Sequence, residues 1–177
     1  MKIVSALLTS AVFASAAASA QPVNAPAPTA GVKAFLDVLN SGNGKLMEQM
    51  SPAEARQVLI GAQQGVVLPP AQVSDKTIQI KGQSIKLKIV KPENTKGTLP
   101  VFMFFHGGGW VLGDFPTHER LIRDLVRESG AAAVYVDYTP TPESHFPVAI
   151  DQAYEATKWV AEHGKEIGVD GTRLGLV

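Results

Sequence analysis

Polar and apolar residues alternate with a period of two over residues 77–91. The apolar positions are Ile78, Ile80, Ile85, Leu87 and Ile89, and lysine or glutamine side chains stand between them. This period predicts two half-exposed antiparallel strands that meet at Gly82-Gln83. The many lysines are typical of a strand pair at the edge of a sheet, because charge there discourages pairing with another chain.

Three short apolar runs follow, over residues 101–105, 131–136 and 173–177. Runs of this length that lack alternation are typical of strands buried on both faces. The segments between them change period. Apolar residues return every three or four positions over residues 118–129 and 148–163, which predicts amphipathic helices. Strands and helices that alternate in this way build a parallel sheet with helices on both faces, so the predicted class is three-layer α/β.

Two further helices are expected near the N-terminus, over residues 32–40 and 52–64. Ser51 is the expected N-cap of the second one, with Glu54 reaching back to it as in a capping box. In the C-terminal half, Thr117 is expected to cap the helix that begins at His118, and Gly130 to end it.

The candidate chemistry lies at the end of the run at residues 101–105. His106 comes next, then Gly107, Gly108 and Gly109, and then Trp110. Glycine has no Cβ to shield its amide and tolerates positive φ, so the loop can present bare N–H groups. In a doubly wound sheet, function gathers at the carboxyl ends of strands. The loop is therefore predicted to hold a developing negative charge.

This arrangement resembles the hormone-sensitive-lipase branch of the α/β-hydrolase esterases, whose oxyanion loop has the HGGG pattern. The segments at 137–147 (Asp-Tyr, Pro-Glu, then Phe-Pro) and 169–174 look like later signatures of that branch. The resemblance implies a three-layer α/β-hydrolase fold whose first part occupies residues 71–177, with an antiparallel strand pair at the sheet edge. It also implies an N-terminal helical cap over residues 31–70.

The resemblance implies hydrolysis of a small-molecule carboxylic ester through an acyl-enzyme. Gly107, Gly108 and Gly109 would form the oxyanion hole, and His106 and Asp114 would support the loop. Trp110 and Tyr138 either line the substrate pocket or serve only packing. No metal or cofactor is implied, and no nucleic-acid partner.

The nucleophile of that reaction is missing from the expected pattern. No serine stands in a G-x-S-x-G sequence, and in this family the serine precedes the acid and the histidine. The chain is therefore expected to stop before the nucleophile elbow, to lack the Ser-Asp-His triad and to be inactive alone. The alternative is a non-catalytic ligand-binding protein on a hydrolase scaffold. Ser144-His145 is not expected to act in catalysis, and structural pairing is expected for Asp137 and Glu143.

Composition narrows the classes further. The formal net charge is zero, and the chain has no cysteine. Disulfides, thiol catalysis and thiolate zinc sites are thereby excluded, and nothing favours binding to nucleic acid. Residues 1–20 have a basic start, an apolar middle and an Ala-Ser-Ala end, which predicts a signal peptide cleaved near Ala20. The protein is then expected to be exported, to the periplasm or beyond, with a Pro/Ala-rich linker over 21–30 and no stable membrane anchor. The oligomeric state stays open.

Overall fold

The computed structural model describes residues 26–40 and 45–177, with the side chains of Phe35 and residues 38–40 excepted. The predicted signal peptide, the first half of the linker (21–25) and the predicted helix break at 41–44 lie outside the described residues. The described elements are α1 (Ala30–Asn40), η1 (Met47–Gln49), α2 (Pro52–Gly61), β1 (Gln72–Ile80), β2 (Gln83–Lys91), β3 (Leu99–Phe104), α3 (Phe115–Ser129), β4 (Ala132–Asp137), α4 (Val148–His163), η2 (Gly164–Ile167) and β5 (Val169–Leu176).

The chain divides into two units at Gly44. The first contains α1, in which Lys33 and Asp37 form an i,i+4 ion pair. The second contains everything from Lys45 onward. The expected helical cap over residues 31–70 spans this division, and its role as a cap stays a prediction. Among the described residues, no helix has the length and apolar content needed to cross a membrane.

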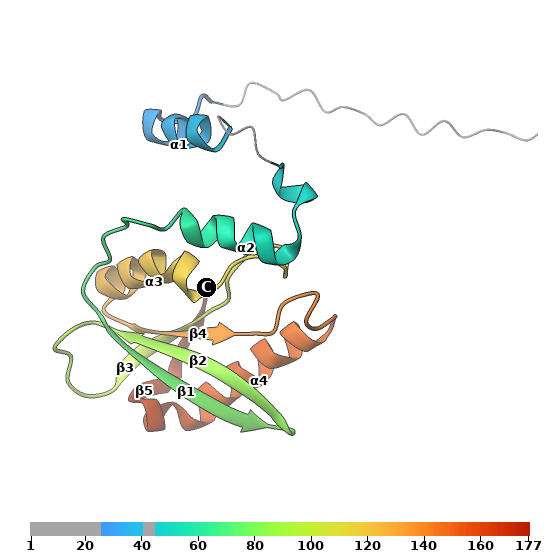
Figure 1. Ribbon diagram of the computed structural model, residues 1–177. Coiled ribbons are helices and arrows are strands. Elements are labelled where there is room, and N and C mark those ends of the chain that lie inside the picture. The colour runs from blue at the N-terminus through green and yellow to red at the C-terminus, as the bar shows by residue number, and fades with distance from the viewer. Residues whose placement is uncertain (1–25, 41–44) are drawn as a thin grey trace, which may run out of the picture. The chain divides into compact units, whose positions relative to one another are not determined.

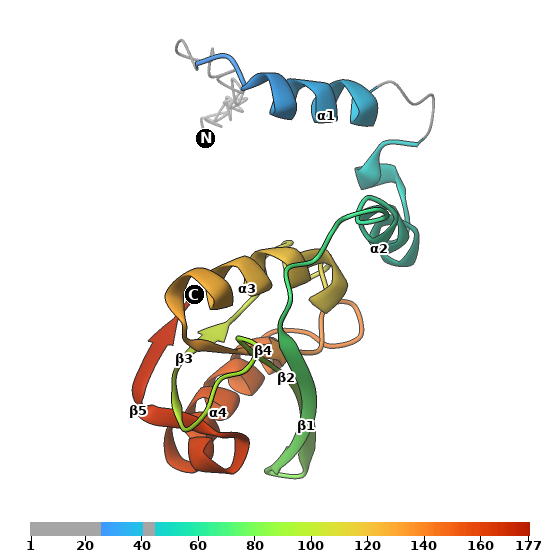
Figure 2. The ribbon, with the colours of Figure 1, turned by 90° about the vertical axis from the view of Figure 1, so that its left-hand side faces the viewer.

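A mixed five-stranded sheet in the order β1-β2-β4-β3-β5 organises the second unit. β1 and β2 pair antiparallel at one edge, as the alternating pattern predicts, and β2 continues antiparallel onto β4. β3 pairs parallel with both β4 and β5. Figures 1 and 2 show α3 and α4 on opposite sides of this sheet. The three-layer α/β class is confirmed.

Alternate residues of the central strands separate into two cores. Val101 and Met103 of β3 join a cluster with Ala156 and Val160 of α4. Phe102 and Phe104 join the other, with Ile122 and Val126 of α3. Both faces of β3 and β4 are therefore covered, which explains why their sequences are apolar without alternation. This double burial fixes where β3 ends, and so where the glycine loop begins.

Several predicted boundaries are wrong. β1 begins at Gln72 rather than at residue 77, and α2 ends at Gly61 rather than at residue 64. α3 begins at Phe115 rather than His118, and its N-cap is Asp114 rather than Thr117. The Asp114 carboxylate accepts from the Thr117 N–H at 2.9 Å, and the Thr117 hydroxyl closes the box onto the Asp114 backbone. β5 begins at Val169 rather than Arg173, because the strand starts beside Leu99 and passes an irregularity before regaining register.

Replacing Asp114 tests the capping box. Asp114→Ala leaves an N–H of the first turn of α3 without its partner, and we expect the free energy of unfolding to fall by about 1 kcal/mol. Asp114→Asn keeps a side-chain oxygen at the cap and should stay within a few tenths of a kcal/mol of the wild type. Urea unfolding of the three proteins measures both values. Equal losses in the two variants would contradict a capping role.

Candidate active site

The loop after β3 has a backbone that its glycines make possible. Gly108, Gly109 and Trp110 have positive φ values of 120°, 63° and 59°. A Cβ at Gly108 would lie 2.1 Å from the Leu112 carbonyl oxygen, so only glycine fits there. Gly107 is different, since a Cβ at that position would meet nothing within 4 Å. The glycine triplet is thus a steric requirement at its centre, whereas its first position is open.

The N–H groups of the three glycines have no hydrogen-bond acceptor among the residues that the structure describes. Gly107, Gly108 and Gly109 are exposed, and within the described part of the chain none of their N–H groups donates to an acceptor. The peptide N–H is an obligatory donor, so three neighbouring exposed amides make a ready site for an anionic oxygen. They follow the carboxyl end of β3, where the sequence predicts the site.

Three carbonyl groups of the same loop, by contrast, accept hydrogen bonds from residues outside it. The Tyr138 hydroxyl donates to the His106 carbonyl oxygen at 2.7 Å. The Thr141 N–H donates to the Trp110 carbonyl at 2.7 Å. The Arg56 Nε donates to the Val111 carbonyl, also at 2.7 Å. Three carbonyls of the loop are therefore held from outside it, while the N–H groups of its three glycines stay open.

His106 is a buried part of the loop, only 7% exposed. Its Nδ1 lies 2.9 Å from the Gly107 carbonyl oxygen, so Nδ1 carries the proton and donates. The ring stacks on Tyr138 with centroids 4.4 Å apart. A Cβ at Gly113 would meet the His106 Nδ1 at 2.6 Å, so the ring packs tightly against that glycine too. Burial lowers the pKa of His106 and keeps its imidazole neutral.

Two solvent-open hollows flank the loop. One, of about 320 Å³, is lined by His106, Gly107 and Tyr138 among others. The second, of about 370 Å³, is lined mainly by apolar groups, including Val111, Phe146 and Ile150. Trp110 contributes to both and is 59% exposed. Tyr138 lines the first hollow and also binds the loop. The sequence left open whether Tyr138 lines a pocket or serves packing, and in the structure it does both.

The other polar side chains singled out in the sequence are not arranged for catalysis. Glu143 pairs with Arg56 as expected, and hydrogen bonding from that guanidinium lowers the pKa of Glu143 to about 2. Asp137 forms no ion pair or side-chain hydrogen bond with any residue that the structure describes, so the pairing expected for it is not found. The Ser144 hydroxyl donates to the Thr139 carbonyl at 2.7 Å.

Asp114 caps α3 directly, and it supports the glycine loop only through that helix. Within residues 26–40 and 45–177, no group of three acidic or histidine side chains could hold a metal ion.

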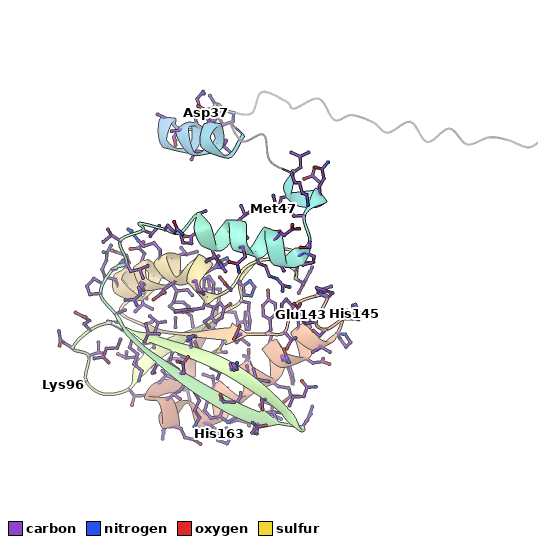
Figure 3. The ribbon with its side chains drawn as sticks, viewed as in Figure 1. Asp37, Met47, Lys96, Glu143, His145 and His163 are labelled. Carbon is purple, nitrogen blue, oxygen red and sulfur yellow. The ribbon has the colours of Figure 1, made fainter. Side chains whose placement is uncertain are left out.

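Arg56 is the site residue that sequence reasoning missed. It lies on α2, and its guanidinium contacts Val111, Thr141 and Glu143, which are 55 to 87 residues away in sequence. Figure 3 labels Glu143 and His145 in the loop that leads from β4 to α4. The sequence shows only that the α2 segment contains a single arginine, and nothing near Arg56 in the sequence indicates its partners.

Comparison with known proteins places this geometry in context. Residues 102–177 match a family described as having the alpha/beta hydrolase fold. Esterase LipI of Mycobacterium tuberculosis is 38% identical over 112 residues, which is 62% of this chain and 35% of that protein. Carboxylesterase NlhH of the same species is 33% identical over 111 residues, again 35% of its length.

A solved structure is more similar in sequence. The thermostable esterase from Pseudomonas putida ECU1011 is 68% identical to this chain, with a TM-score of 0.78 over 81% of this chain and 46% of that one. The chain thus spans about a third of the curated relatives' length and just under half of this solved structure.

The first and the central glycine of the triplet make a matched pair of substitutions. Gly108→Ala forces a Cβ into the Leu112 carbonyl at positive φ, and we expect a loss of about 1–3 kcal/mol in the free energy of unfolding. Gly107→Ala meets no neighbour and should unfold within about 0.5 kcal/mol of the wild type. Thermal or urea unfolding measures both. A Gly107→Ala loss as large as that of Gly108→Ala would contradict the loop geometry.

The buried imidazole predicts a pH dependence. The folded protein holds His106 neutral with a pKa below the unfolded value of about 6.5, so the unfolded chain binds more protons. Its contribution is fully present above pH of about 6.5 and is lost as the pH falls through that value toward the folded pKa. We expect the unfolding free energy of His106→Gln, measured from pH 8 to pH 5, to decline less than that of the wild type. Parallel curves for the two proteins would refute the burial argument.

Proposed function

We propose that this chain belongs to the hormone-sensitive-lipase-like esterases of the α/β-hydrolase fold, and that it carries the oxyanion-binding part of a serine carboxylic ester hydrolase. The observation that carries the proposal is the set of exposed N–H groups of Gly107, Gly108 and Gly109, which lack internal acceptors while the loop's carbonyls are bound.

In this proposal, a serine attacks the ester carbonyl and the carbonyl oxygen becomes an oxyanion. The glycine N–H groups donate to that oxygen, and they need no rearrangement because the loop is already fixed. Removing one such donor from an oxyanion hole typically costs about 10²–10³ in rate. His106 keeps the loop in shape through the Gly107 carbonyl and takes no proton from the serine.

The substrate we propose is a small-molecule ester. The apolar hollow beside Trp110 suits an uncharged acyl or alcohol group, since its lining offers few polar partners. Neither a cofactor nor a metal is needed, because the reaction uses only a serine nucleophile, an acid, a base and the oxyanion donors.

We also propose that these 177 residues do not turn over esters alone. The support is that no serine in the sequence stands in a G-x-S-x-G elbow. In addition, the Ser144 hydroxyl already donates a hydrogen bond to the Thr139 carbonyl. For the intact gene product we propose export after cleavage near Ala20, on the strength of the pattern at residues 1–20.

The test is hydrolysis of a p-nitrophenyl ester by the purified 177-residue chain and by any longer polypeptide that the reading frame proves to encode. We expect no release above background from the chain alone, no labelling by a fluorophosphonate, and the same result for Ser144→Ala. The longer polypeptide should hydrolyse the ester and become labelled.

Serine-dependent turnover by the 177-residue chain would refute the inactivity proposal, and its loss in Ser144→Ala would identify the serine responsible. A longer polypeptide that binds the ester without turnover would favour the alternative, a binding protein on a hydrolase scaffold.

A further inference from the structure

Helix α2 contacts the rest of the second unit with few fully buried apolar side chains. Ala55 is the one buried residue among its ten, and Val58 is 40% exposed. Such a helix gains little from apolar burial, which is the usual source of helix docking energy. Its N-terminus is nevertheless well formed, since Ser51 and Glu54 make a reciprocal capping box. What positions α2 must therefore be sought in its polar side chains.

The Arg56 guanidinium makes four hydrogen bonds in three directions. Nη1 and Nη2 donate to the two Glu143 carboxylate oxygens at 2.6 and 2.9 Å. Nη2 also donates to the Thr141 carbonyl at 2.9 Å, and Nε to the Val111 carbonyl at 2.7 Å. One side chain thus joins α2, the glycine loop and the loop between β4 and α4.

The contact at Val111 matters because of its position. Val111 directly follows Gly108, Gly109 and Trp110, which all have positive φ. The Val111 and Leu112 N–H groups turn back onto the Gly108 carbonyl. A shift of the Val111 peptide would therefore rotate the glycine amides. A second link is adjacent, where the Thr141 N–H donates to the Trp110 carbonyl at 2.7 Å. Arg56 binds the carbonyl of that same Thr141, so it holds both sides of the link.

We propose that Arg56 is a positioning residue, which couples the docking of α2 to the orientation of the Gly107–109 amides. The proposal rests on the proposed function, because it assigns those amides to an oxyanion. Lysine could not take its place. An ammonium group is a point charge without the planar fork, so it cannot serve a carboxylate and two carbonyls in these directions at once. Glu143 completes the device by fixing the plane of the guanidinium.

The test uses glycine-selective ¹⁵N labelling of the 177-residue chain, so it needs no catalysis. The variants are Arg56→Lys, Arg56→Ala and Glu143→Gln. The matched control is Arg123→Lys. Arg123 likewise binds a carboxylate, that of Glu119, and a backbone carbonyl, that of Pro69, but it does not contact the glycine loop. Gly130 and Gly168, which precede β4 and β5, serve as internal references.

We expect the Gly107–109 amide resonances to shift or broaden in Arg56→Lys and in Glu143→Gln, while the two reference glycines stay in place. In uniformly ¹⁵N-labelled samples, hydrogen exchange of the Leu112 and Thr141 amides should become about tenfold faster in the Arg56 variants, because local opening becomes easier. Arg123→Lys should leave the loop resonances unchanged.

Unchanged loop resonances in Arg56→Lys would overturn the proposal, even if the melting temperature falls, because that result fits an anchor for α2 alone. Equal shifts in Arg123→Lys would overturn it as well. If Arg56→Ala does not fold, Arg56→Lys decides. Failure here leaves the ester hydrolase proposal standing, and an inactive longer polypeptide leaves this coupling standing, so the two outcomes are separable.

Discussion

A loop that must leave its N–H groups open cannot be held by those groups, and this constraint governs the structure around His106. Ordinary turns are fixed by bonds from their own amides. Here the amides of the glycines are free, and the carbonyls of His106, Trp110 and Val111 are bound by Tyr138, Thr141 and Arg56. The donors come from the segment after β4 and from α2. The shape of the loop therefore depends on neighbouring elements of the second unit as well as on its own glycines.

The layered fold supplies those donors at the right place. Because β3 and β4 run parallel and side by side, their carboxyl ends lie together, which places Tyr138 beside His106. Burial on both faces leaves the strands little freedom to slide, since a one-residue slip would exchange the two apolar cores. Rigidity at this level matters for oxyanion binding, where donors are effective because they are aimed before the charge develops.

The sequence predicted the strand order and the place of the glycine loop after β3 well, because both depend on local pattern. Alternation identified β1 and β2, and the capping box at Ser51 was found as predicted. The start of α3 was missed because Phe115 and Pro116 read as loop residues, although proline is favoured at the first helical position. The start of β5 was missed because Asp170-Gly171-Thr172 resembles a turn, and only pairing with β3 makes it a strand. Arg56 depends on partners 55 to 87 residues away, which no local pattern encodes.

The Arg56–Glu143 pair is better understood as a geometric device than as a source of stability. Glu143 is half exposed, and ion pairs of that kind contribute little to the free energy of folding. The ion pair is only one part of the arrangement, which also includes the backbone carbonyls of Val111 and Thr141. The guanidinium engages both, and its fixed fork makes the three contacts mutually consistent in only one arrangement of the two loops. A half-exposed pair can therefore define the position of the glycine loop while adding little to the energy that holds the fold together.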